Sequence, residues 1–182
     1  MKKTNTKNIA YISLFAVMIC LCGLITVPSS VPFTLQSFAV CISLIYLGGK
    51  RGTLSVLLYI FIGSLGLPVF SGGQGGFGIL FGQTGGYIIG LVLIGVVYTL
   101  SEKFAENKKF IRHNSLSVGH IVCYAAGTLQ FALIYSKKTG TASIWQILTI
   151  CVLPFLIPDL LKIIIAVPLA DKLKKITKNG VV

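Results

Sequence analysis

Charged side chains along this chain are separated by long apolar tracts. No Asp, Glu, Lys or Arg occurs within residues 8–49, 52–101, 114–136 or 139–158. An apolar helix needs about 20 residues to cross the hydrocarbon core of a bilayer. The first two tracts can each hold two such helices and the last two can each hold one. The pattern therefore predicts six transmembrane helices.

The expected spans cover residues 9–27, 33–49, 53–70, 79–100, 116–135 and 145–170. Backbone groups in lipid must bond to one another, so apolar tracts of this kind form helices. The second tract is short for a full crossing, and a re-entrant segment there would leave five spans. We expect an all-α integral membrane protein, with a single transmembrane domain over residues 1–182.

The N-terminus also resembles a secretory signal peptide, because Lys2, Lys3 and Lys7 precede an apolar run. That run is long for a signal peptide and lacks a small-x-small cleavage site. Further apolar tracts follow it. We expect this segment to be the first transmembrane helix.

Composition and charge agree with a membrane protein. Hydrophobic residues make up 54% of the chain and charged residues 11%, against about 25% charged in a typical soluble domain. The net charge is +12. With six spans, most basic residues fall on the side of the two tails, and the opposite side has only Lys137 and Lys138. The positive-inside rule then predicts a multi-pass cell-membrane protein with cytoplasmic termini, in contact with anionic lipid and not with nucleic acid.

Two charged residues lie inside the sixth predicted span. Asp159 and Lys162 are three positions apart, so both project from one helix face within reach of each other. An ionisable group at the centre of a membrane helix costs about 2.5–3.5 kcal/mol and usually has a function. We expect a pocket with one acceptor and one donor, and the alternative is an ion pair that only fixes packing. Pro154 and Pro158 weaken the helix ladder, which would free carbonyl groups for the pocket.

A glycine-rich segment lies between the third and fourth predicted spans. Residues 71–90 contain nine glycines, and Phe77, Phe81 and Tyr87 distinguish the segment from a plain flexible linker. We expect residues 71–83 to form an ordered loop that folds over a pocket as a lid. The lid glycines are Gly72, Gly73, Gly75 and Gly76. The alternatives are a flexible linker and a glycine-based helix-packing face.

Neither catalysis nor metal binding is indicated. The five cysteines all lie in apolar tracts, and the Cys20-x-Cys22 spacing is not that of a zinc site, so we expect buried core side chains. His113 and His120 flank the start of the fifth span without a second group of ligands, and no chemistry is assigned to them.

Four segments taken in order resemble the BioY family. They are VPFTLQ (31–36), LSVLLYIFIGSLGLPVFSGGQGG (54–76), GQTGGYIIG (82–90) and PDLLK (158–162). BioY proteins are the biotin-specific substrate-binding S components of energy-coupling factor (ECF) vitamin transporters. The resemblance implies a six-helix S-component bundle with a vitamin site near the extracytoplasmic side and no chemistry on the substrate.

The same resemblance implies partners. An S component binds its vitamin tightly and works with a transmembrane T component and two ABC-type ATPases. This sequence has no Gly-x-x-x-x-Gly-Lys-Ser/Thr motif, so ATP hydrolysis has to come from a partner. We expect high-affinity biotin binding without a cofactor, and reorientation in the membrane with residues 71–83 as the lid.

The family's Asp-x-x-Lys pair corresponds to Asp159 and Lys162. Biotin offers ureido N–H donors, an apolar thioether ring and a carboxylate tail. We assign the ureido N–H groups to Asp159, and electrostatic support or the carboxylate to Lys162, with exchanged roles left open. Other residues expected to line the pocket or close the loop are Gln36, Gln83, Thr84 and Tyr87.

Two positions depart from the family pattern. Gln83 stands where the family usually has Pro, which alters the stiffness or polarity of the lid. For contact with the T component the family uses Ala-x-x-x-Ala on the first helix. The nearest match here is Ala16-x-x-x-Cys20, with Ser13 nearby.

Two other function classes compete with this interpretation. A membrane enzyme would need a nucleophile–base pair or a metal at membrane depth, whereas the spans hold one carboxylate and only His120 near an end. An ion-coupled carrier would use Asp159 as a proton relay and should show two similar halves, which the sequence does not.

Overall fold

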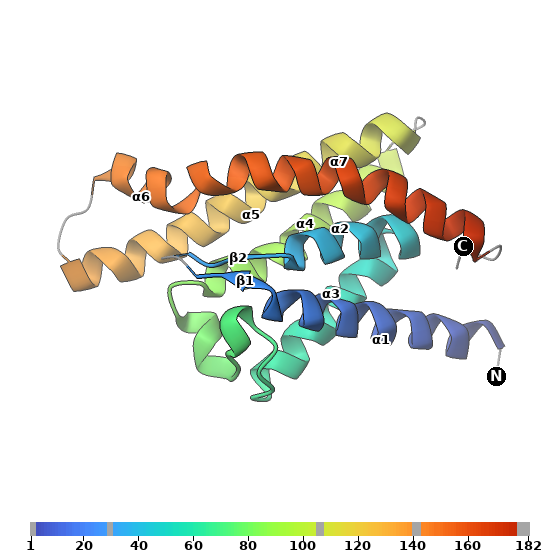
Figure 1. Ribbon diagram of the computed structural model, residues 1–182, viewed down its shortest axis with the longest axis horizontal. Helices are drawn as coiled ribbons and strands as arrows, with labels where there is room; N and C mark the ends of the chain where they lie inside the picture. The colour runs from blue at the N-terminus through green and yellow to red at the C-terminus, as the bar shows by residue number, and fades with distance from the viewer. Residues whose placement is uncertain (1–2, 29–30, 105–107, 140–142, 178–182) are drawn as a thin grey trace.

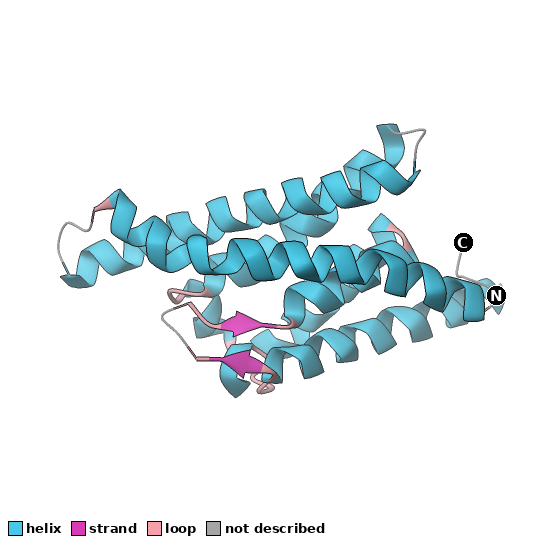
Figure 2. Ribbon diagram, turned by 45° about the horizontal axis from the view of Figure 1, so that its top comes forward, coloured by secondary structure: helices cyan, strands magenta, loops and turns pink. Residues whose placement is uncertain are grey.

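The computed structural model describes residues 3–28, 31–104, 108–139 and 143–177, and the ends of the predicted domain (1–2 and 178–182) lie outside this part. The helices are α1 (Lys3–Leu24), α2 (Gln36–Leu47), α3 (Gly49–Ser64), α4 (Gly85–Phe104), α5 (Lys108–Thr139), α6 (Ile144–Cys151) and α7 (Leu153–Ile176) (Figure 1). Two short strands, β1 (Thr26–Val27) and β2 (Phe33–Thr34), pair antiparallel (Figure 2). Two 3-10 turns, η1 (Ser71–Gly73) and η2 (Phe77–Phe81), form the glycine-rich loop.

The helices form one elongated bundle. The start of α1 and the end of α7 lie at the same end of the molecule, while α6, the hairpin and the glycine-rich loop lie toward the other end (Figure 1). The expected fold class is confirmed, with α6 and α7 together forming the sixth helical segment. The loop and the hairpin therefore meet in the half of the bundle that is remote from the start of α1.

Within the part of the chain that the structure describes, four helical segments are long and apolar enough to cross a membrane: 6–24, 85–104, 112–136 and 145–176. Helices α2 and α3 have 12 and 16 residues, too few for a core of about 30 Å at about 1.5 Å per residue. Helix α2 is central, since Ala39 to Leu47 are buried on every face. A helix that is apolar all round belongs in such an interior position.

The end of α1 and the start of α2 differ slightly from the expected span ends. Helix α1 ends at Leu24 rather than at residue 27, and α2 begins at Gln36 rather than at residue 33. The residues between them form the hairpin, in which Thr26 pairs with Thr34. The Thr26 hydroxyl donates to the Gly23 carbonyl at 2.6 Å, which satisfies one of the free carbonyls at the helix end.

The next boundaries shift for reasons of backbone geometry. Helix α3 begins at Gly49 and ends at Ser64 rather than covering 53–70, and Gly66 follows with a φ of 103°. Helix α4 begins at Gly85, because the residues assigned to the start of the fourth span form η2. A residue with positive φ ends a helix, and glycine adopts it at least cost.

The fifth and sixth spans are longer than predicted, and the sixth is interrupted. Helix α5 covers 32 residues. Helices α6 and α7 are separated at Val152, which has a φ of −125° and a ψ of −53°. Pro154 then occupies the first turn of α7, where its missing N–H is not needed. Pro158 lies inside α7, just before the ion pair.

The residues predicted to contact the coupling module point inward. Ala16 is fully buried and Cys20 is 9% exposed, so the Ala16–Cys20 pair faces the bundle interior. The assignment of this pair to an outward contact surface is wrong. Among the described side chains of this helix, those of Ala10 and Ser13 are small and face outward. The face that turns inward is set by packing against α2 and α3, which helical periodicity alone does not specify.

Candidate substrate-binding site

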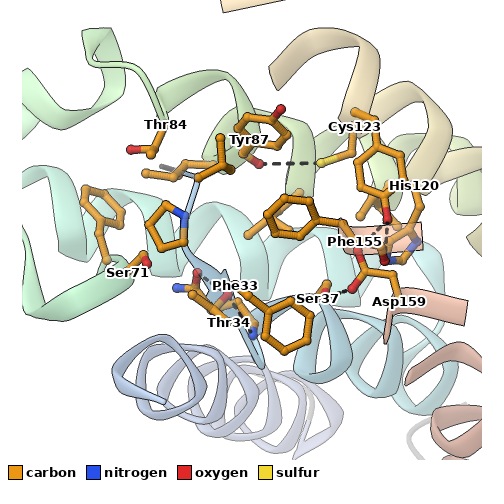
Figure 3. Close-up of a pocket in the computed structure, with 18 of the residues that line it drawn as sticks. Phe33, Thr34, Ser37, Ser71, Thr84, Tyr87, His120, Cys123, Phe155 and Asp159 are labelled. Atoms are coloured by element: carbon orange, nitrogen blue, oxygen red, sulfur yellow. Dashed lines mark hydrogen bonds between the residues drawn. The ribbon is translucent and has the colours of Figure 1, made fainter. Parts of the chain in front are cut away.

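An internal cavity lies between the hairpin, the glycine-rich loop and helices α2, α4, α5 and α7 (Figure 3). Its volume is about 90 Å³, well above the roughly 10–15 Å³ that one water needs. Its apolar lining comes from Val31, Pro32, Phe33, Phe70, Ile79, Ile88, Leu91, Ile94 and Phe155. Its polar lining comes from Thr34, Gln36, Ser37, Ser71, Gln74, Thr84, Tyr87, His120, Cys123, Tyr124, Asp159 and Lys162.

Lys162 is buried at one end of this cavity and all its donors are used. Its ammonium donates to Asp159 Oδ1 at 2.7 Å, to the Thr34 carbonyl at 2.8 Å and to Ser37 Oγ at 2.9 Å. The Phe33 ring lies against the same ammonium, 3.9 Å from Nζ to the ring centroid. An ammonium has three N–H groups, so none remains for a ligand in this arrangement.

The Asp159 carboxylate is held by three side chains from three helices. Oδ1 accepts from Lys162 and, at 3.0 Å, from the Ser37 hydroxyl. Oδ2 accepts from the Tyr124 hydroxyl at 2.6 Å. A carboxylate has about four acceptor positions, so Oδ2 keeps one more. The two residues therefore form a fixed ion pair, and its carboxylate keeps one open acceptor position beside the cavity.

Gln36 lines the cavity, but its amide is used within the protein. Its Nε2 donates to the Tyr59 hydroxyl at 2.6 Å and to the Val69 carbonyl at 3.4 Å. Its Oε1 accepts from the Thr34 hydroxyl at 3.2 Å. Gly23 leaves room for this amide, since a Cβ there would overlap it. Gln36 thus joins the start of α2 to α3 and to the segment before the loop.

Thr84 and Tyr87 also line the cavity, at the start of α4. The Tyr87 hydroxyl points away from the cavity, toward Thr128 Oγ1 at 3.1 Å and the Cys151 carbonyl at 3.2 Å. That carbonyl lies at the break before α7, where the Phe155 N–H bonds to Val152 instead. The break thus frees the Cys151 carbonyl, but Tyr87 occupies it and it does not serve the cavity, and this carbonyl is not one that the missing N–H of Pro154 or Pro158 would free.

Gln83 is not among the residues that line the cavity, although its neighbour Thr84 is. Of the six residues predicted to contact the substrate, the structure brings together five: Gln36, Thr84, Tyr87, Asp159 and Lys162. Sequence reasoning missed Ser37, Tyr124 and His120. A polar side chain within an apolar tract could have indicated these site residues, as for His120 and Tyr124, which lie four positions apart on one face of α5.

The glycine-rich loop is ordered by backbone conformations that favour glycine. Gly72, Gly73 and Gly76 have φ values of 72°, 72° and 102°. Gly75 has no positive φ, but a Cβ there would overlap the Leu67 carbonyl oxygen. Three of the four lid glycines are thus needed for their backbone conformation and the fourth for close approach.

Hydrogen bonds tie the loop to three other elements. The bonds are Gly76 N–H to the Gly63 carbonyl at 2.8 Å, Gly72 N–H to Thr26 Oγ1 at 3.2 Å, and Gln130 Nε2 to the Leu80 and Gly82 carbonyls at 2.9 and 2.8 Å. Phe70, Ser71 and Gln74, in η1 and beside it, reach the cavity. The loop covers one end of the cavity, and its motion as a lid stays a prediction.

Comparison with known proteins identifies the family. The model of the BioY family matches residues 1–179. The chain belongs to the BioY family. The biotin transporter BioY of Thermotoga maritima is 34% identical over 165 residues, which is 90% of this chain and 93% of that protein. The probable biotin transporter BioY of Pyrococcus horikoshii is 32% identical over 171 residues, 93% of this chain and 98% of that protein.

A solved structure gives the same result. The crystal structure of the S-component for biotin from an ECF-type ABC transporter superposes on this chain with a TM-score of 0.78. The two are 26% identical, and the match covers 96% of this chain and 95% of that one. The BioY assignment from the four sequence segments is therefore confirmed.

Proposed function

We propose that this BioY-family chain binds biotin in the cavity beside Asp159 and is the substrate-specific S component of an ECF-type biotin transporter. The named relatives and the superposed S component support the substrate. The observation that carries the proposal is a buried carboxylate with one open acceptor position, at the end of a cavity with largely apolar walls. Such an acceptor suits the ureido N–H groups of biotin, and a charged acceptor strengthens the bond.

The two ends of the cavity favour one orientation of the ligand. Figure 3 shows Asp159 and Ser71 at opposite ends. Ser71 Oγ is buried and has no partner among the described residues, so it can donate to the carboxylate tail. Lys162 has no free N–H, which favours a supporting role for it over direct contact with that tail. The thioether ring then packs on the apolar walls between the ends.

Orientation in the membrane and partners follow from the same proposal. The start of α1 and the end of α7 lie at one end of the bundle, and the loop lies toward the other (Figure 1). With both termini cytoplasmic, as the basic residues predict, the cavity lies in the extracytoplasmic half. A T component and two ABC-type ATPases would supply the ATP-driven step.

The direct test is calorimetric titration of the purified, detergent-solubilised chain with biotin, after removal of any biotin retained from purification. Riboflavin and thiamine serve as controls. Saturable binding of biotin alone is expected. If folded protein that is verifiably free of biotin gives no heat of binding on titration with biotin, the substrate assignment is ruled out. The membrane fold would be unaffected by that result.

A further inference from the structure

His120 lines the cavity and has a buried ring nitrogen without a hydrogen-bond partner among the described residues. The side chain is 3% exposed and lines the cavity from α5. Its Nδ1 lies 2.8 Å from the Leu116 carbonyl oxygen. A carbonyl can only accept, so Nδ1 carries the hydrogen, and the neutral ring then has a lone pair on Nε2. Among the described residues, Nε2 has no hydrogen-bond partner.

The described polar residues beside His120 already use their donors elsewhere. The His120 ring meets the Tyr124 ring edge to face, with centroids 6.3 Å apart. The Tyr124 hydroxyl is directed at Asp159, and the three N–H groups of Lys162 are used. A buried acceptor without a partner costs about 1–3 kcal/mol. A ligand that donates a hydrogen bond to Nε2 would remove this cost.

The position of His120 indicates which donor this is. Figure 3 shows His120 and Asp159 at the same end of the cavity, on α5 and α7. Asp159 Oδ2 offers one open acceptor position there, and His120 Nε2 offers a second. Two acceptors on neighbouring helices match a ligand with two N–H groups on one ring.

We propose that His120 Nε2 accepts one N–H of the bound ligand while Asp159 accepts the other, which makes His120 a specificity-determining residue for a cyclic urea. This inference rests on the proposed function, in which biotin supplies that urea. A ring that lacked one N–H would leave a buried acceptor unpaired, and sites of this kind discriminate strongly against such analogues.

The test compares His120→Gln with His120→Phe in the same biotin titration. Gln places an amide oxygen near the position of Nε2, whereas Phe keeps a ring but has no acceptor. We expect His120→Phe to bind biotin about 10- to 100-fold more weakly. We expect His120→Gln to recover most of that loss.

A second measurement uses the wild-type protein and so does not depend on how the variants fold. The chain has two histidines, so ¹⁵N-histidine labelling gives few signals, and the His120 signals are those lost in His120→Gln. Biotin is expected to move the Nε2 signal of His120 upfield, as for a lone pair that accepts a hydrogen bond, and to leave His113 unchanged.

The outcomes separate the two proposals. Unchanged affinity in His120→Phe, or a His120 nitrogen signal that biotin does not move, would overturn the role of His120 while biotin binding stands. If both variants bind weakly, a shifted Nε2 signal supports the hydrogen bond and an unshifted one overturns it. If folded wild-type protein binds no biotin, the proposed function and this inference both fail.

Discussion

The two ends of the cavity are built in different ways. At the α7 end, Asp159 is fixed by side chains from α2, α5 and α7 itself, and the charges are buried. At the loop end, most bonds join backbone groups, and the large side chains Phe77 and Phe81 of η2 are 62% and 69% exposed. Side-chain networks fix donor and acceptor positions, whereas a loop with exposed apolar side chains opens at lower cost. Ligand recognition is therefore expected at the α7 end, and ligand entry and release at the loop end.

The largest effect is expected when one charge of the Asp159–Lys162 pair is removed. Lys162→Met leaves the Asp159 carboxylate buried without its counter-charge, which costs about 3–5 kcal/mol. Thermal unfolding in detergent should show a strongly lowered midpoint. The double variant Asp159→Leu/Lys162→Met removes both charges and should recover most of the stability without recovering biotin binding. Equal midpoints for the single and double variants would show that the two charges are not coupled.

The second effect tests recognition by charge. Asp159→Asn keeps the shape of the side chain but removes the charged acceptor, and biotin affinity should fall by at least about 100-fold. Asp171→Asn is the matched control, because Asp171 pairs with Arg112 and does not line the cavity. The assignment fails if calorimetry gives Asp159→Asn the affinity of the control.

A smaller effect is expected from the hydroxyl that orients the carboxylate. Tyr124→Phe removes the donor to Asp159 Oδ2, and a bond to a charged group contributes about 1.5–3 kcal/mol. The same titration should show biotin affinity lowered by at least about tenfold. Tyr46→Phe loses a hydroxyl that bonds to Thr177 instead, outside the cavity. Loss of equal size in both variants would contradict a specific role for Tyr124.

The smallest effect concerns the loop end. Gly76→Ala forces a side chain into a φ of 102°, whereas Gly78 has no positive φ and open space around it. Strain of about 1–2 kcal/mol should loosen the closed loop and speed release of radiolabelled biotin by a few-fold. Gly78→Ala should leave the release rate unchanged. Similar rates in the two variants would show that backbone strain does not control access.

The bundle and the ion pair are the parts that the sequence predicts well. In lipid the backbone must satisfy its own hydrogen bonds, so a long apolar tract forms a helix. The charge-free runs of the sequence therefore locate the helices. Asp159 and Lys162 are found by spacing, because residues three apart share a helix face.

The parts that the sequence does not predict depend on contacts between distant residues. Tyr124 lies 35 positions from Asp159 and Ser37 lies 122 positions away, and no local pattern connects them. The hairpin ends α1 early because its two strands pair with each other, which hydropathy does not indicate. The inward direction of Ala16 and the position of Gln83 outside the cavity lining have a related reason, since the direction of a side chain on a helix or turn depends on what packs against it.

The location of both charges on α7 also has a consequence for how the protein is made. As this hydrophobic segment leaves the ribosome and partitions into the bilayer, Asp159 and Lys162 can neutralise each other within one helical turn. A pair divided between two helices would leave a lone charge in hydrocarbon until its partner helix arrived. The segment can thus enter the membrane as a nearly neutral unit. Its two charged groups then form their hydrogen bonds to Ser37 and Tyr124 when the other helices pack around it.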